Sequence, residues 1–179
     1  MGNAWKHFKT ITCHRHLVMK HCFQVGLYRR GLLHDLSKYG WTEFRVGVRY
    51  YQGTRSPNAA EREAEGYSTA WMHHKGRNKH HYEYWTDLAP VPMPTEYLVE
   101  MVMDRIAACK VYRGADYGDG DALEYLEKTG DARMMHPETL EKLRFLLTML
   151  RDQGQTETFR FIRQVVLKGL PYGGETVQP

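Results

Sequence analysis

The sequence predicts an all-α fold, a compact helical bundle. Apolar residues recur at intervals of three and four along most of the chain, no segment alternates as a strand does, and glycine or proline separates the periodic segments. The chain has 179 residues, of which 42% are hydrophobic and 26% charged. Because this length suffices for one core, we expect a single domain spanning residues 1–179.

Helices are expected in the first part of the chain at about residues 5–25, 28–38 and 41–51. The apolar face of the first is formed by Phe8, Ile11, Val18, Met19, Cys22 and Val25. Gly26 ends this helix, so the second should return antiparallel beside it. The pair Ser56-Pro57 begins another helix that reaches about His74, with Gly66 as a weak point.

The second part begins with a loop at residues 75–81 and an extended linker at 89–94, where three alternating prolines remove backbone donors. A helix is expected at 95–112, and its apolar face carries Tyr97, Met101, Ala108 and Tyr112. Further helices begin at Asp121, which has capping-box spacing to Glu124, at Pro137, and at Thr156. We therefore expect a core at about 5–112, helices packing on it from 121 to 168, and a loose tail at 169–179.

Composition gives weaker indications. The net charge of +4 slightly favours an anionic ligand. Three widely spaced cysteines, Cys13, Cys22 and Cys109, indicate reduced thiols rather than a disulfide framework. No apolar segment has the length of a signal peptide core or a membrane span, so we expect a soluble, cytoplasmic protein without a membrane partner.

The adjacent residues His34 and Asp35 are the first candidates for chemistry. They place an imidazole and a carboxylate side by side, and Lys38 follows three residues later. A nitrogen donor, an oxygen donor and a cation suit a divalent metal bound beside an anionic substrate. Such a pair also occurs at ordinary helix ends, so the hypothesis requires further ligands that converge on it.

Helical geometry selects candidates for those ligands. A rotation of about 100° per residue places His14 and His21 on the flank of the first helix's apolar face, while His16 points to the surface. Axial height excludes neither flanking histidine, so His14 and His21 both remain candidates, and the choice of His14 also depends on the resemblance given below. Asp104 lies at the edge of a later apolar face, where a carboxylate is costly to bury unpaired. A metal and an ion pair with Arg105 or another cation are equally weighted explanations.

A histidine cluster precedes the linker. Four histidines occur within nine residues, as two adjacent pairs: His73, His74, His80 and His81. Each pair must project its rings in different directions, so we expect at least one ring to contact a metal or phosphate; the alternative is a solvated basic loop. Trp71 and Trp85 flank the cluster and could stack a nucleobase, although such large aromatics are usually core residues.

The order His14, His34-Asp35 and Asp104 in an all-α chain resembles the HD-domain metal-dependent phosphohydrolases, whose motif is a histidine, a His-Asp doublet and a distal aspartate. The segment Leu32–Lys38 is similar to that family's leucine-rich run into His-Asp and then lysine. The segment Met103–Ile106 is similar to its closing aspartate segment.

More narrowly, residues 10–112, including the segment 70–81, look like an uncharacterised bacterial and phage family of short HD-like proteins. Two features depart from the HD-domain pattern. The interval between His14 and His34 is shorter than in many HD domains, and Ser37 stands where glycine is frequent.

The resemblance implies a first metal bound by His14, His34, Asp35 and Asp104. It also implies that His74, His80 or His81 holds a second metal or the substrate phosphate, and we assign His74 to metal and the other two to substrate. Cations available for phosphate oxygens are Lys38, Arg77, Lys79 and Arg105. Asp35, Lys38 and Glu43 are the candidate catalytic residues, although for Glu43 a surface position is favoured over orienting a water.

The expected function is that of a metal-dependent phosphohydrolase acting on a nucleotide or other small phosphate ester through a metal-activated water. It would use one or two divalent cations per chain, among which Mn, Mg, Fe, Co, Ni and Zn are not distinguished. The less favoured alternative is a non-catalytic HD-like module that binds nucleic acid or a nucleotide through residues 75–81. Such binding would weaken steeply with salt, whereas metal-dependent turnover would vanish with a chelator.

Overall fold

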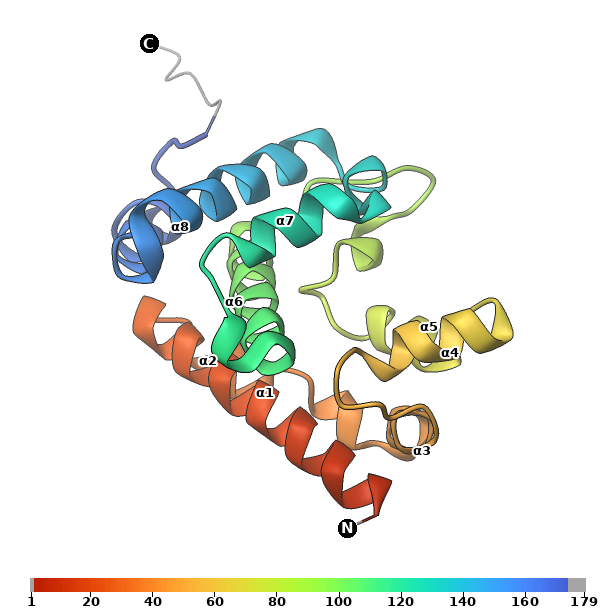
Figure 1. Ribbon diagram of the computed structural model, residues 1–179. Helices are drawn as coiled ribbons and strands as arrows, with labels where there is room; N and C mark the ends of the chain where they lie inside the picture. Colours follow the sequence, from red (N-terminus) through yellow and green to blue (C-terminus); the bar gives the residue numbers. More distant parts are fainter. Residues whose placement is uncertain (1, 174–179) are drawn as a thin grey trace.

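The computed structural model describes residues 2–173 as helices joined by short connections (Figure 1). The α-helices are α1 Asn3–Val25, α2 Tyr28–Leu33, α3 Trp41–Arg49, α4 Pro57–Glu65, α5 Thr69–Lys75, α6 Thr95–Arg113, α7 Asp121–Lys128 and α8 Pro137–Gln164. The 3₁₀ helices are η1 Leu36–Tyr39, η2 Tyr82–Trp85, η3 Gly114–Asp116, η4 Gly130–Arg133 and η5 Val166–Lys168. Within residues 2–173 the only β-type pairing is an isolated bridge between Thr86 and Pro90, so the all-α prediction is confirmed.

Helix α6 lies at the centre and contacts α1 on one side and α7 and α8 on another (Figure 1). Its middle is buried almost all round, because residues 98–103 are each at most 4% exposed. The apolar face predicted for this helix is therefore incomplete: Met101 is buried, but Tyr97 and Tyr112 are only partly covered. This central position lets α6 carry apolar packing toward α8 and polar side chains toward α1.

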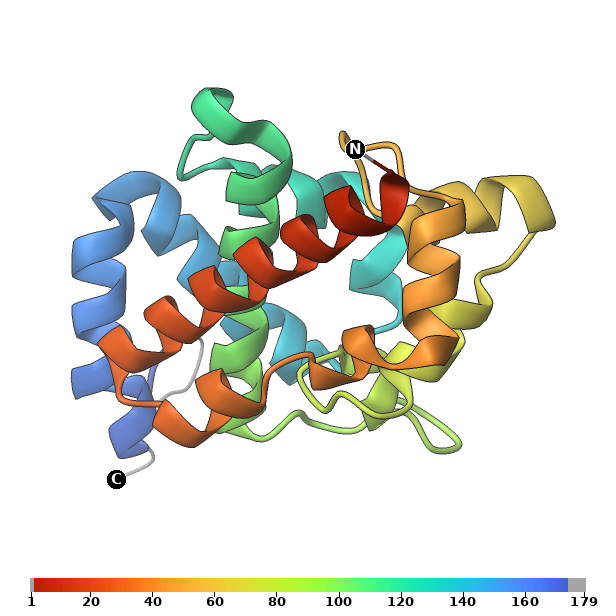
Figure 2. The same cartoon turned by 90° about the horizontal axis from the view of Figure 1, so that it is seen from below.

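Helix α2 runs back along α1 after a turn at Gly26, whose φ of 93° is the left-handed conformation that favours glycine (Figure 2). The predicted helix 28–38 is wrong in its second half, because α2 ends at Leu33 and η1 starts at Leu36. His34 and Asp35 occupy the break, and Asp35 has a φ of 54°, the only positive value for a non-glycine among residues 2–173. Neighbours in a helix diverge by about 100°, whereas this break allows both side chains to turn inward.

The predicted helix from Pro57 to His74 is divided at Gly66, whose φ is 81°. The buried carboxylate of Glu61 in α4 connects this helix to the start of α5. Its oxygens accept hydrogen bonds from Ser68 Oγ at 2.5 Å and Thr69 Oγ1 at 2.6 Å. Ser68 also caps α5 by accepting from the backbone N–H of Trp71 at 3.0 Å. This corner fixes the direction of the short helix that carries two histidines of the cluster.

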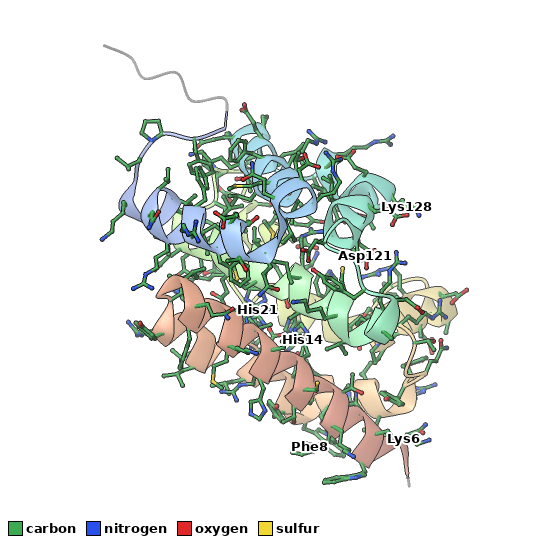
Figure 3. All side chains as sticks on the ribbon, turned by 60° about the vertical axis from the view of Figure 1, so that its left-hand side comes forward. Lys6, Phe8, His14, His21, Asp121 and Lys128 are labelled. Atoms are coloured by element: carbon green, nitrogen blue, oxygen red, sulfur yellow. The ribbon has the colours of Figure 1, made fainter. Side chains whose placement is uncertain are left out.

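The inner face of α1 departs from the predicted apolar face near the start of the helix. Phe8 lies on the outer side of α1 (Figure 3) and is 37% exposed, whereas His7 is 5% exposed. The His7 ring packs on Gly47 of α3, where an added Cβ would lie 2.0 Å from His7 Nε2. The missing side chain of a glycine far along the chain therefore decides which residue is buried.

The C-terminal helices follow the predicted segments with two refinements. Asp121 is the first residue of α7 rather than its cap, and its Oδ2 accepts from the Gly118 N–H at 2.9 Å, so the predicted capping box is wrong. The helices predicted from Pro137 and Thr156 join as α8 across a kink at Gly154. Residues 174–179 of the predicted tail lie outside the described residues. No helix within residues 2–173 combines the length and apolarity required to cross a membrane.

Candidate metal centre

A polar centre lies where α1, the turn between α2 and η1, α5, the segment after α5, and α6 meet. Each element supplies one or two side chains: His14, His34, Asp35, His74, His80, His81 and Asp104. Asp35 stands in the middle, with a side chain 1% exposed. Segments up to 90 positions apart in sequence therefore converge on the His34-Asp35 pair.

The first ligand group consists of His14, His34, Asp35 and Asp104, whose candidate ligand atoms all lie within 4.8 Å of one another. Asp104 Oδ1 lies 2.8 Å from His14 Nε2 and 3.4 Å from His34 Nε2. His34 Nε2 lies 3.3 Å from Asp35 Oδ2. Imidazole nitrogens and carboxylate oxygens in this arrangement suit a divalent transition metal.

The second ligand group consists of Asp35, His74, His80 and His81, again within 4.8 Å. Asp35 Oδ1 lies 3.2 Å from His74 Nε2 and 3.4 Å from His80 Nε2. Since Asp35 Oδ2 faces the first group, the two oxygens of this carboxylate face different groups. Asp35 would therefore contribute one carboxylate oxygen to each group if both groups held a metal.

The inward atoms of both groups lack the partners that buried polar atoms normally have. Among the described residues, seven of them are buried without a hydrogen bond of normal geometry: His14 Nε2, His34 Nε2, Asp35 Oδ1, Asp35 Oδ2, His74 Nε2, His80 Nε2 and His81 Nε2. Leaving a buried polar atom unsatisfied costs about 1–3 kcal/mol. Coordination of a cation satisfies imidazole and carboxylate lone pairs together, so this donor set fits a metal.

Two further carboxylates hold the outer nitrogens of these histidines. Glu100 Oε1 lies 2.9 Å from His34 Nδ1 and 3.2 Å from His80 Nδ1. Glu43 Oε2 lies 2.8 Å from His74 Nδ1. When Nδ1–H donates to a carboxylate, the Nε2 lone pair is free to bind a metal, and this is the usual arrangement around metal-bound histidine.

The surface position favoured for Glu43 is wrong, because the residue is 7% exposed and also binds His73 Nδ1 at 2.8 Å. Glu100 was not among the site residues predicted from the sequence. The available signal was its position four residues before Asp104, one turn away on the same face of α6.

A model of a protein family matches residues 3–149. The chain belongs to DUF5662, a family of unknown function. The matched region runs from α1 into α8 and contains every residue of both ligand groups. No match is found among curated proteins or among solved structures.

The charges within this DUF5662 site are strongly coupled. Burial opposes a charge on His34, but Asp35, Asp104 and Glu100 outweigh it and raise the pKa of His34 well above 6.5. Burial likewise opposes the Asp35 carboxylate, but His34, Lys38 and His74 hold its pKa well below 3.8. For His81, burial and the neighbouring histidines lower the pKa. Asp35 is therefore ionised, as a metal ligand must be, whereas His34 would have to release a proton on binding a metal.

Lys38 is the predicted cation that lies at the centre. Its Nζ is 2.5 Å from Asp35 Oδ2. Burial opposes its charge, but Asp35 and Asp104 outweigh this effect and raise the lysine pKa above its ordinary value. A permanent positive charge is thus held beside the bridging carboxylate.

The other predicted basic residues lie elsewhere. Arg105 Nη2 binds Asp131 Oδ2 at 3.0 Å, and Asp104 instead contacts His14 and His34, so the ion pair considered for Asp104 and Arg105 is not formed. Arg77 and Lys79 are exposed and line a cleft on the far side of His80. Their predicted contact with phosphate stays a prediction.

The alternatives among the histidines are resolved by packing. His14 and His21 lie on the side of α1 that faces the rest of the chain (Figure 3). His14 reaches the centre, His21 packs edge-on against Phe159 with ring centroids 5.4 Å apart, and His16 is exposed as predicted. The ring of Trp71 packs 4.7 Å from that of His81. This tryptophan supports the second ligand group instead of presenting a free face for a nucleobase.

Proposed function

We propose that this protein is a metal-dependent phosphohydrolase, similar to the HD-domain enzymes, that acts on a nucleotide or other small phosphate ester. One observation carries the proposal: the two buried oxygens of Asp35 face two groups of histidine Nε2 atoms, and among the described residues none of these atoms makes a hydrogen bond of normal geometry. Apart from one another, their nearest charged neighbours are the Asp104 carboxylate and the Lys38 ammonium, and a bound cation would satisfy the imidazole and carboxylate lone pairs together.

The donor set favours catalysis over a structural ion. Both groups consist of histidine and aspartate without thiolate, whereas closed structural zinc sites often use cysteine. When bound, a divalent cation supplies a water of lowered pKa and neutralises charge on a phosphate. The resemblance to the HD-domain motif, with His14, His34-Asp35 and Asp104 now close in space, supports the same chemistry.

The chain's own residues position the reaction. Glu43 and Glu100 hold the imidazole rings in orientation through their Nδ1 atoms. Lys38 holds a positive charge where the phosphate oxygens would approach Asp35. Phosphoryl transfer depends mainly on such positioning and charge neutralisation, so little further acid–base chemistry is needed. Cys13, Cys22 and Cys109 are free, as a reducing cytoplasm would leave them, and we place the enzyme there.

The alternative of a nucleic-acid module resting on residues 75–81 receives less support. His80 is 2% exposed and contributes to the centre, and His81 packs between Trp71 and His74. The segment therefore exposes mainly Arg77 and Lys79 to a partner. We accordingly favour the enzyme.

The test is metal analysis of the purified protein combined with a hydrolysis screen of phosphate monoesters, phosphodiesters and nucleotides. His14→Ala and His16→Ala form a matched pair on one helix, since only His14 reaches the centre. We expect His14→Ala to lose metal and turnover and His16→Ala to retain both. Absence of metal in the wild type, with no turnover after addition of Mn²⁺, Mg²⁺, Co²⁺, Ni²⁺, Fe²⁺ or Zn²⁺, would contradict the proposal.

A further inference from the structure

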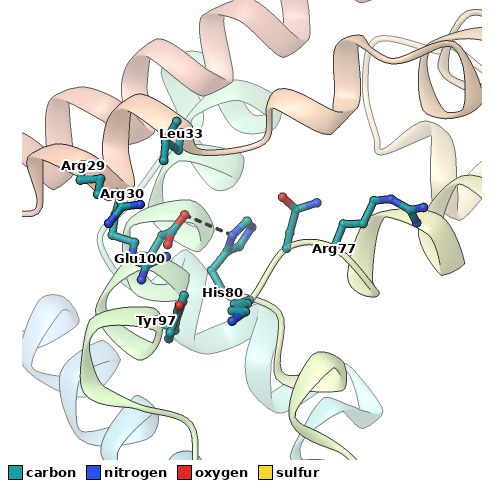
Figure 4. Close-up of a pocket in the computed structure, with 9 residues that line it drawn as sticks. Arg29, Arg30, Leu33, Arg77, His80, Tyr97 and Glu100 are labelled. Carbon is teal, nitrogen blue, oxygen red and sulfur yellow. Dashed lines mark ion pairs between the residues drawn. The ribbon is translucent and has the colours of Figure 1, made fainter.

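A cleft of about 430 Å³ lies on the side of His80 that faces away from Asp35, between α2, the segment 77–80 and α6 (Figure 4). His80 separates the two sites, since its Nε2 faces Asp35 and its Nδ1 faces Glu100, which lines the cleft. The volume lies within the range of small-molecule sites, about 300–1,000 Å³. The cleft is therefore adjacent to the metal centre without sharing its inward ligand atoms.

The walls of the cleft are basic on both sides. Arg29 and Arg30 of α2 lie on one side of the His80–Glu100 pair, and Arg77 lies on the other (Figure 4). Lys79 also lines it. Within residues 2–173, no carboxylate lies within ion-pair distance of Arg29, Arg77 or Lys79, whereas Arg30 is paired with Glu96 at 2.5 Å. Arg77 donates to the His73 backbone carbonyl at 3.4 Å, and Lys79 lies 5.8 Å from the Tyr97 ring centre, but no carboxylate among the described residues neutralises the charge of Arg29, Arg77 or Lys79.

The acidic residue in the lining does not neutralise them. Glu100 is 4% exposed, and its Oε1 lies between the Nδ1 atoms of His34 and His80 at 2.9 and 3.2 Å. The Glu100 carboxylate therefore interacts with His34 and His80 on the side of the metal centre rather than with the cations of the cleft. The cleft keeps a positive field, which attracts anions.

The number of free cations indicates the size of the anion. A phosphate monoester carries about −1.5 to −2 charges near pH 7, so one phosphate would leave part of this charge unmatched. Arginine can bind phosphate oxygens bidentately, and basic residues spread along the cleft from Arg29 to Arg77 suit an anion with more than one phosphate.

The aromatic ring that lines the cleft, Tyr97, already packs against other side chains of the protein. The Arg30 guanidinium lies 3.9 Å from the centre of the Tyr97 ring, and Trp85 packs 5.4 Å from it. A nucleobase therefore has no free aromatic surface on Tyr97. We propose that the cleft binds the phosphate chain of a small polyphosphate, such as a nucleoside triphosphate, and recognises the phosphates rather than the base. The inference goes beyond the proposed function, because this binding requires neither metal nor turnover.

Calorimetric titration of the full chain, stripped of metal and then dialysed free of chelator, tests this binding at low salt. We expect tripolyphosphate to bind, ATP to bind within about threefold of it, and inorganic phosphate to bind at least about tenfold more weakly, each tenfold step corresponding to about 1.4 kcal/mol. Arg29→Gln/Arg77→Gln should weaken tripolyphosphate binding at least tenfold. The matched control Arg163→Gln/Lys168→Gln removes the same charge at exposed positions outside the cleft and should change it less than twofold.

Three results would overturn the proposal. Equal weakening by both double variants would show unspecific attraction to net charge. Loss of binding in Lys38→Gln, with retention in the cleft variant, would place the anion at the ligand groups, where Lys38 is the nearest cation. Tighter binding of a single-stranded oligonucleotide than of tripolyphosphate through the same arginines would indicate nucleic acid. The titration is done without metal, so its result does not depend on turnover. If the protein binds tripolyphosphate through Arg29 and Arg77 but shows no hydrolysis in the metal-supplemented screen, the proposed function is refuted and this inference stands.

Discussion

Two regions of the molecule bury their side chains in opposite ways. Where α8 packs on α6 and α7, Leu143, Leu146, Leu147 and Leu150 are fully buried among apolar neighbours. In the candidate metal centre, seven polar atoms of the described residues are buried without a hydrogen bond of normal geometry. Full burial of an apolar side chain stabilises by about 1.5–3 kcal/mol, whereas each unsatisfied polar atom costs about 1–3 kcal/mol.

Helix α6 belongs to both regions. Its Ile106 is fully buried in the apolar core, and its Glu100 and Asp104 face the histidines. The contrast teaches that the apolar region stabilises the fold, while the polar centre has the composition that the proposed metal site requires. Substitutions in the two regions should therefore separate metal binding from stability.

The largest effect is expected from Asp35→Asn, because this carboxylate faces both ligand groups. Loss of an outer partner alone costs about 10–100-fold in metal affinity or activity, so loss of the bridging ligand should cost more than about 100-fold in both. Metal content and turnover measure this, with the exposed Asp152→Asn as control. Retention of full metal content by Asp35→Asn would remove Asp35 from the centre.

Leu147→Ala tests the apolar region, where α8 packs on α6 and α7, and should change stability rather than metal binding. Removing a fully buried leucine from the core is expected to lower the free energy of unfolding by about 2–5 kcal/mol. Urea denaturation measures the loss, and metal content per folded chain should stay at the wild-type value. A matching loss of metal at temperatures where the variant is folded would show that the regions are not separable.

The two outer carboxylates should differ in effect. Glu100→Gln disturbs His34 and His80, one histidine from each ligand group, so we expect a loss in metal affinity near the upper end of the range of about 10–100-fold. Glu43→Gln disturbs only His74 within these groups and should lie near the lower end. Competitive titration against a metal-binding dye measures both affinities. The reverse order would show that the second ligand group dominates binding.

The smallest effect is the pH dependence contributed by histidines outside the centre. Burial lowers the pKa of His21 to about 4, with a smaller contribution from Lys110. The native state then binds fewer protons than the unfolded state between pH 6.5 and 4, so stability is complete above pH 6.5 and is lost as the pH falls through this window. The loss between pH 7 and 5 should be on the order of 1–2 kcal/mol.

Chemical denaturation of metal-free wild type and His21→Gln over this pH range checks the prediction. The variant should lose less stability on acidification than the wild type, because glutamine does not titrate. Parallel curves for the two proteins would show that His21 titrates normally in the native state.

Local patterns predicted the helices well where glycine or proline sets the ends. Gly26 ends α1, and Pro57 and Pro137 begin α4 and α8, since these residues restrict the backbone whatever packs on it. Facing along α1 also selected His14 over His16. The break at Asp35 was not predicted, because its left-handed backbone is maintained by contacts with distant segments.

The sequence by itself determined the helical pattern and the residue types of the candidate metal centre, because periodicity and the His34-Asp35 pair are local properties. Only the tertiary structure decided that Asp35 faces two groups, that Glu43 is buried and that Glu100 takes part. The last two pair with histidines 31 and 66 positions away, at His74 and His34. Such pairing depends on how α3 and α6 dock, which no spacing within one helix encodes.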